Sequence, residues 1–267
     1  MDKSAVRIEA PASGYTAANV FGEDLDAMPV AAADQALYTV VSGTPPATVA
    51  EVIAVMQQID GCLGNDDGLK WFNWLYLQVT QKVDLQPLTA WQDSSWLLAL
   101  DVVFANFYLR ALAGFLSGAP DVAASWSALL ESRYKPGVDR ILFALAGMNA
   151  HINHDLALAL LATDADLEVV PSLTGPQHAD YETVNALLKA VMPVALQQLA
   201  TGILGMLAED TGKIGRVLAF WDICKARDLA WGFADQLRGL TGVAKDAALD
   251  AQDAVTGALG RAILAVG

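Results

Sequence analysis

The sequence predicts an all-α protein, folded as a single-domain multi-helix bundle of about eight to ten helices. Two apolar runs at helical spacing, near residues 94–116 and 138–161, are long enough to form central, antiparallel helices, and no stretch sustains the alternation typical of strands. With 267 residues, of which 54% are hydrophobic and 17% charged, the chain can bury a substantial core. We expect the bundle to occupy residues 44–267.

The segment before the bundle has a different character. Residues 1–43 are rich in Ala, Gly and Asp without sustained periodicity, and they are interrupted by Pro11, Gly14, Gly22 and Pro29. We expect an irregular N-terminal arm there. Thr44 as N-cap and Pro45 at the first helical position then predict a helix that runs to about Asp60.

The first central helix carries a carboxylate in an apolar setting. An aromatic segment over residues 69–80 precedes it and is best explained by core packing. Within residues 94–116, Asp101 and Tyr108 share a helix face with Ala105 between them. A buried carboxylate needs a partner. That partner is either a tyrosine or arginine in the core, or the histidines across the bundle.

The second central helix carries the most polar cluster of the chain. At spacings of three and four residues, His151, His154 and Asp155 fall on one narrow face, while Asn149 and Asn153 form a separate stripe. The positions one and two turns earlier on the same face have almost no side chain, which leaves room for a polar pocket; they are Gly147 and Ala144.

The remaining helices follow from their breakers. A loop over residues 171–176 delivers His178 just before a helix that opens at Asp180 or Tyr181, where the positive helix end favours the neutral, metal-binding imidazole. We expect that helix to be kinked or divided at Pro193. Asp121 is expected to cap a short helix, and a turn is expected at 212–215. Two further helices are expected over 216–240 and 245–266.

In the segment 216–240, Arg227 and Trp231 lie four residues apart. This spacing predicts a guanidinium over an indole ring.

Charge and cysteine content restrict the class of protein. With 16 basic and 30 acidic residues, the net charge of −14 argues against nucleic-acid partners and anionic membrane surfaces. Charged residues stand where a signal peptide needs its apolar segment, and the two distant cysteines fit a reducing compartment, so we expect a cytoplasmic protein.

Residues 96–116 are long enough to span a bilayer. They include Asp101 and Arg110, each costing about 2.5–3.5 kcal/mol at a bilayer centre, so we do not expect membrane insertion. The sequence carries no signal for the oligomeric state.

The run Asn149-Ala150-His151-Ile152-Asn153-His154-Asp155-Leu156 resembles the signature of a bacterial, all-helical family of unknown function, Asn-Ala-His-Ile-Asn-His/Tyr-Asp-Leu. The resemblance covers roughly residues 50–240. It is supported by Asp101, Phe104, Tyr108, Asp180-Tyr181, Val184-Asn185, Arg227 and Ala230-Trp231. It implies a helical fold and no particular chemistry. Because the family pattern accepts tyrosine at the position of His154, it does not imply an obligatory ligand there.

The chain is also similar, in one spacing, to zinc-dependent phospholipases C and the related single-strand nucleases. These all-helical enzymes place two zinc ligands on one helix as His-x-x-x-Asp, the spacing of His151 and Asp155. The chain lacks their Gly-Asp-x-x-Gln-Pro-x-His continuation and has too few histidines for a three-metal centre.

Three kinds of chemistry suit these residues. A single zinc ion bound by His151, Asp155 and one or two of His178, His154 and Asp101 would leave a position for water and would make a hydrolase. Without a metal, His151 paired with Asp155 or Asp101 is a general base, and Tyr108 is a donor to a developing oxyanion. The third alternative is a purely structural hydrogen-bonded network.

We expect Asp101, Tyr108, His151, Asp155 and His178 to converge on one pocket. The function predicted from this convergence is an intracellular enzyme acting on a small, largely apolar molecule through a His/Asp centre, with metal-dependent hydrolysis as its particular form. The alternatives are a non-catalytic small-molecule binding protein, a metal-free acid–base enzyme of cyclase or isomerase type, and a helical scaffold. The sequence identifies neither the substrate nor the reaction.

Overall fold

The computed structural model describes residues 30–201 and 222–266 of the chain, and within them it contains helices and no strand. This confirms the predicted all-α bundle of about eight to ten helices. The elements are η2 (Ala32–Asp34), α2 (Gln35–Val41), α3 (Val49–Cys62), α4 (Gly68–Asp84), η3 (Leu88–Ala90), α5 (Ser94–Ser117), α6 (Ala124–Leu130), α7 (Arg140–Ala150), η4 (His151–Asp155), α8 (Leu156–Asp166), α9 (Pro176–Thr201), α11 (Ile223–Arg238) and α12 (Gly242–Leu264).

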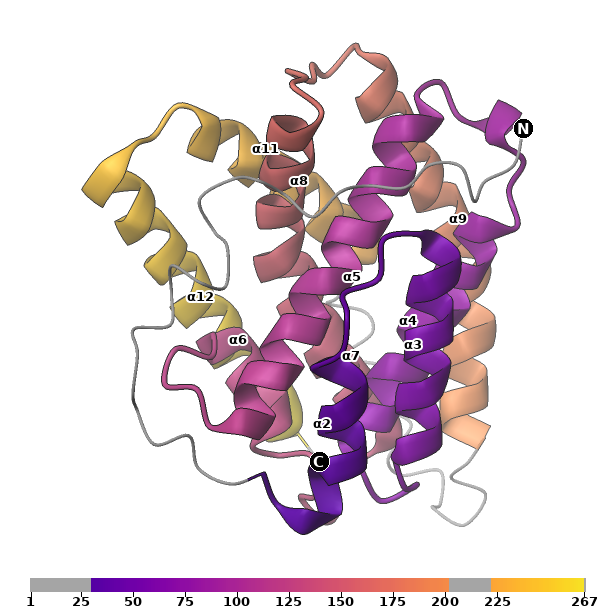
Figure 1. Ribbon diagram of the computed structural model, residues 1–267, viewed down its shortest axis with the longest axis vertical. Helices are drawn as coiled ribbons and strands as arrows, with labels where there is room; N and C mark the ends of the chain where they lie inside the picture. The colour runs from indigo at the N-terminus through magenta and orange to yellow at the C-terminus, as the bar shows by residue number, and fades with distance from the viewer. Residues whose placement is uncertain (1–29, 202–221, 267) are drawn as a thin grey trace.

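Helix α5 crosses the middle of the bundle, with α9 and α12 on opposite sides (Figure 1). It runs antiparallel to the chain segment α7–η4–α8, as predicted. Near its start, Trp96 donates from Nε1 to Asp164 Oδ1 at 2.9 Å, and two turns later Phe104 stacks on His151. Residues later in α5 therefore contact residues earlier in the α7–η4–α8 segment, as in an antiparallel pair.

Helix α5 is also long and apolar enough to cross a membrane, and it is the one such helix among the described residues. In its most apolar window, 61% of the residues are buried inside the bundle. That degree of burial is expected of the core helix of a bundle.

The part of the N-terminal arm that is described packs on the bundle. Residues 1–29 lie outside the described residues, but α2 is helical within the range expected to be irregular, and Leu37 is only 2% exposed. Asp34 also lies 3.1 Å from the guanidinium of the buried Arg133. Apolar contact and an ion pair therefore hold residues 32–41 in place.

Several helix ends differ from the sequence-based expectation. The N-cap of α3 is Thr48, whose hydroxyl accepts from the Glu51 amide at 3.2 Å, and Thr44 lies outside the helix. The short helix α6 begins after Ala123, because Asp253 of α12 accepts the amides of Ala124 and Ser125. A capping group distant in sequence thus replaces the expected Asp121.

Helix α9 begins at Pro176, so His178 lies in its first turn, and it continues through Pro193 without a break. The expected turn at 212–215 lies outside the described residues.

Candidate active site

The polar cluster sits on a widened helical turn. Residues His151–Asp155 form the π-helical segment η4, which joins α7 directly to α8. Isolated π turns inside α-helices are frequent at functional sites, because the wider turn changes the direction of side chains without ending the helix. The sequence alone indicates one continuous α-helix here.

Asp155 is the centre of a buried hydrogen-bond network. Its Oδ2 accepts from Trp126 Nε1 at 2.9 Å and lies 3.0 Å from His151 Nδ1, while its Oδ1 lies 2.8 Å from His154 Nδ1. His154 Nε2 in turn lies 3.8 Å from Asp253. Both oxygens of Asp155 are therefore engaged.

These contacts set the protonation states. Burial opposes the charge of Asp155, but the hydrogen bonds and charges of the two histidines outweigh it and hold the pKa of Asp155 below its ordinary value. For His154, burial is likewise outweighed by Asp155 and then Asp253, which raise its pKa. For His151, burial dominates and lowers the pKa despite Asp155. The arrangement favours a protonated His154, an ionised Asp155 and a neutral His151.

A neutral His151 donates through Nδ1 to Asp155, so its Nε2 carries the lone pair. The imidazole is held between aromatic rings. Phe104 stacks on it with 3.5 Å between ring centroids and 4° between ring planes, and Tyr76 lies edge-on with 4.5 Å between centroids. Its Nε2 is buried and has no hydrogen-bond partner among the described residues. Position, tautomer and orientation of this base are thus fixed.

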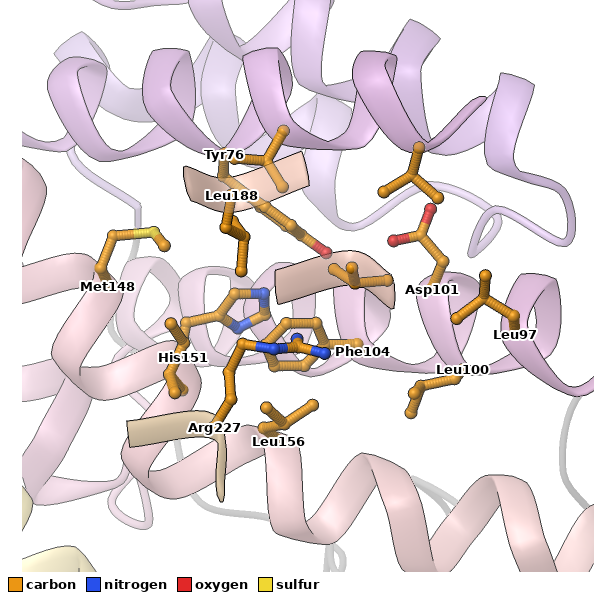
Figure 2. A pocket seen from close by; sticks show the side chains of 14 residues that line it. Tyr76, Leu97, Leu100, Asp101, Phe104, Met148, His151, Leu156, Leu188 and Arg227 are labelled. Carbon is orange, nitrogen blue, oxygen red and sulfur yellow. The ribbon is translucent and has the colours of Figure 1, made fainter. Parts of the chain in front are cut away.

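The imidazole lines a cavity of about 50 Å³ between α4, α5, η4, α9 and α11 (Figure 2). By volume, it has room for roughly three or four waters. Its walls are mostly Leu, Val, Ile, Met and Phe side chains, and its polar lining consists of Tyr76, Asp101, His151 and Arg227. Asp101 and His151 therefore line the same cavity, on which the sequence predicted them to converge.

Asp101 lies on the cavity wall contributed by α5. Its Oδ2 is buried and has no hydrogen-bond partner in the described part of the chain. Desolvation and then the negative charge of Asp84 raise its pKa from 3.8 to about 7, although Arg227 acts in the opposite direction. Near neutral pH this carboxyl group is present in both protonated and ionised forms.

The Tyr76 hydroxyl is a second polar group without a good bond. It is buried, and the neighbouring Thr80 hydroxyl lies next to it without completing a sound hydrogen bond. Burial, followed by the charge of Asp101, raises the pKa of Tyr76, so this phenol stays protonated and can donate.

Arg227 enters the cavity from α11. It does not stack on Trp231 as its spacing predicted; its guanidinium carbon lies 4.0 Å above the ring of Tyr181 on α9. Its Nε donates to Asn185 Oδ1 at 2.7 Å and its Nη2 to the Tyr181 carbonyl at 2.8 Å. Packing between α9 and α11 replaces the expected contact within one helix.

Of the predicted site residues, only Asp101 and His151 line the cavity. Asp155 bonds to His151 from outside the lining, His154 bonds to Asp155, and the last two predicted residues lie elsewhere. Tyr108 is buried beneath the imidazole, with ring centroids 6.3 Å apart, and its hydroxyl donates to Asn73 Oδ1 at 3.4 Å. It does not line the cavity. His178 packs edge-on against Trp231 at 4.7 Å between centroids, and it also lies outside the cavity lining.

The space expected above the histidine face is occupied. A Cβ on Gly147 would lie 2.3 Å from the Phe72 ring, so an aromatic side chain of α4 fills the place that the small residues were expected to leave open. The cavity instead opens on the other side of the imidazole, towards α5 and α11. The stripe of Asn149 and Asn153 is separate, as predicted, and bonds to α12.

The residues do not fit the predicted zinc site. The Nδ1 atoms of His151 and His154 both face Asp155, whose oxygens are already engaged, and His178 is in another part of the bundle. Among the described residues, no group of three or more His, Cys, Asp or Glu side chains is placed to hold a metal ion. Only one imidazole nitrogen, His151 Nε2, faces the cavity without a partner.

Sequence reasoning misses the roles of Trp126, Tyr76 and Arg227. Trp126 lies on a helix too short for its orientation to be inferred, and Tyr76 lies within an aromatic segment whose composition indicates only packing. The spacing of Arg227 points to its own helix, whereas its partners lie more than 40 positions away.

Residues 49–266 match a family described as a family of unknown function, DUF5995. The chain belongs to DUF5995. This confirms the expected resemblance to an uncharacterised helical family, and the match extends beyond the range of 50–240. No curated protein and no solved structure matches the chain.

Proposed function

We propose that this DUF5995 protein is a metal-free general acid–base enzyme that acts on a small, largely apolar molecule inside the cell. In this proposal His151 Nε2 is the base and Asp101 is the acid. The single observation that carries it is the unpartnered Nε2, which faces a cavity while Asp155 holds the opposite ring nitrogen.

Asp155 supports the base in two ways. Its hydrogen bond fixes the tautomer that leaves Nε2 free, and its charge stabilises the imidazolium that forms when Nε2 takes a proton. The bond from Trp126 holds the carboxylate in position. A base thus prepared is ready before a substrate enters.

Asp101 supplies the complementary proton transfer. With a pKa of about 7, its protonated form is available near neutral pH, and proton donation from it is not strongly uphill. His151 takes a proton from one atom of the bound molecule and Asp101 gives a proton to another. This pair of steps is an isomerisation. Exchange with water then returns both groups to their starting states.

The structural alternative explains only part of the cluster. A buried network can account for Asp155, His154 and Trp126, because each of them is bonded. It gives no reason for leaving His151 Nε2 and Asp101 Oδ2 without partners on the walls of one cavity, since buried polar atoms are normally hydrogen-bonded.

Proton abstraction is measurable without knowing the substrate. We would incubate the protein in D₂O with acetone and with pyruvate and follow the loss of C–H signals by proton NMR. We expect exchange above the buffer rate with wild type, and a reduction of about 100-fold or more in His151→Gln. His178→Gln is the matched control, because that imidazole lies outside the cavity.

Equal rates for the wild type and His151→Gln would refute the role of His151 as base. Elemental analysis provides an independent check. Stoichiometric zinc that is lost in His151→Gln would show that the metal hydrolase, and not the metal-free enzyme, is the correct interpretation.

A further inference from the structure

Arg227 brings a positive charge into a cavity whose other walls are mostly apolar. The residue is 6% exposed and lines the same cavity as His151 and Asp101 (Figure 2). A buried guanidinium is costly unless hydrogen bonds and an opposite charge compensate it.

The contacts of Arg227 within the protein are with neutral groups. Its two hydrogen bonds go to the side-chain oxygen of Asn185 and the carbonyl of Tyr181, and its flat face lies over the Tyr181 ring. No ion pair joins Arg227 to a carboxylate within the ranges 30–201 and 222–266. These contacts fix the orientation of the guanidinium and use two of its five N–H groups. The charges of Asp101 and Asp228 act on Arg227 without an ion-pair contact to it among the described residues.

Asp101 interacts with Arg227 through its charge alone, and near neutral pH that charge is partly removed by protonation. It faces the same cavity, but no ion pair or hydrogen bond links its Oδ2 to Arg227 among the described residues. The guanidinium and the carboxyl group are therefore two separate polar groups on the wall of one cavity.

We propose that Arg227 is the binding site for the carboxylate of a small monocarboxylic acid, which would occupy the cavity with its carbon chain against the apolar wall. The proposal rests on the proposed function and specifies its substrate class. A planar guanidinium fork matches a carboxylate in geometry and charge. The cavity volume fits a group of about four non-hydrogen atoms, the size of acetate.

Larger or more highly charged anions fit less well. Phosphate and sulfate are strongly hydrated, and a single arginine offers little to replace their water. The net charge of −14 also disfavours multiply charged ligands. A monocarboxylate adds one negative charge, which the guanidinium neutralises.

The test is a titration of wild-type protein with acetate at constant ionic strength, with acetamide as the neutral analogue of the same shape. The readout is the side-chain Nε–H resonance of Arg227 in a ¹H–¹⁵N spectrum. We expect a saturable shift with acetate and none with acetamide. Absence of an acetate-dependent shift at Arg227 would overturn the proposal, whatever the variants do.

Variants assign the site. Arg227→Gln should weaken acetate binding about 10- to 100-fold, the loss typical of a charge-assisted bond. Arg261→Gln is the matched control, because it removes one positive charge from an exposed position of α12. If Arg227→Gln unfolds, Arg227→Lys, which keeps the charge and loses the fork, should still bind acetate more weakly than wild type. Unchanged affinity in the folded variant would refute the site.

Binding and proton abstraction are separable. His178→Gln should bind acetate within about twofold of wild type, since that imidazole lies outside the cavity. Acetate binding without C–H exchange of acetone or pyruvate would support the carboxylate site and refute the proposed acid–base activity. Pyruvate exchange that is equally fast in Arg227→Gln and in wild type would refute the carboxylate site and leave His151 as the base.

Discussion

The packing of Phe72 against the bare backbone of Gly147 provides a quantitative prediction. A methyl group at Gly147 would lie 2.3 Å from Cγ and 2.5 Å from Cβ of Phe72. Ordinary carbon contacts are about 3.5–4.0 Å, so in Gly147→Ala the ring must move by roughly 1 Å or more. Phe72 is fully buried and contacts three further aromatic rings besides His151, which restrict that movement.

The magnitude follows from two opposing effects. Overpacking a core costs about 1–3 kcal/mol, sometimes more, while alanine gains up to about 1 kcal/mol over glycine inside a helix. Because the overlap here is with an enclosed ring, we expect Gly147→Ala to lower the free energy of unfolding by about 1–2 kcal/mol. At about 2–4 °C per kcal/mol for a domain of this size, Tm should fall by several degrees.

The chain offers a matched control in Gly232, which lies inside α11, where a methyl group would have no other atom within 4 Å. Gly232→Ala should stabilise the protein by about 0.5–1 kcal/mol through helix propensity alone. Urea denaturation followed by tryptophan fluorescence measures both variants. If Gly147→Ala is as stable as Gly232→Ala, Phe72 does not rest on Gly147 and the described packing around His151 is wrong.

Three further predictions concern buried polar groups. Burial raises the pKa of Asp101 from 3.8 to about 7, so between these pH values the folded state holds a proton that the unfolded state releases. The free energy of unfolding should therefore fall as the pH rises from about 4 to 7, by on the order of 2–4 kcal/mol. Urea titrations across this pH range should show a flatter profile for Asp101→Asn than for wild type. Trp126→Phe removes the indole donor to Asp155 and should cost about 1–3 kcal/mol in the same assay; no loss would mean that this bond contributes nothing. Asp67 and Arg133 form a buried ion pair, in which Arg133 Nε donates to Asp67 Oδ1 at 3.0 Å. Asp67→Ala removes this partner, leaves the guanidinium buried with Asp34 as its remaining ion pair, and should cost on the order of 3 kcal/mol in thermal unfolding. A change below about 0.5 kcal/mol would contradict the buried pair.

The central helices and the faces that carry their polar residues can be predicted from the periodicity of the sequence. The apolar spacing of residues 94–116 and 138–161 identifies the two central helices, and the spacing of polar residues within them places Asp101 and His151 on facing surfaces. Both properties are local, because a helix face depends only on neighbours three and four positions away.

The unpredictable part depends on contacts between distant segments. The packing of α4 against α7 decides which side chain covers Gly147. The packing of α9 against α11 decides which ring lies beneath Arg227. The predicted position of His178 is wrong for the same reason, since its neighbour Trp231 comes from another helix. Proximity in sequence suggests three histidines in one site, and packing separates one of them.

The π turn at His151–Asp155 has a consequence for how this protein tolerates insertions and deletions. A wide turn holds one residue more than an α-helical turn, so α8 is out of phase with a regular continuation of α7 by about one residue, or about 100°. Deleting a single residue here would restore a regular helix and leave the following side chains of α8 facing their present neighbours on α5 and α11. A deletion within the regular part of α8 would instead rotate every side chain that follows it by about 100°. Only the second change would misalign Asp164 with Trp96, because the first keeps the phase of α8 and loses the wide turn alone. The packing of this bundle therefore constrains the length of the regular stretch of α8 more strictly than that of the wide turn, whose removal would affect the site and spare the packing.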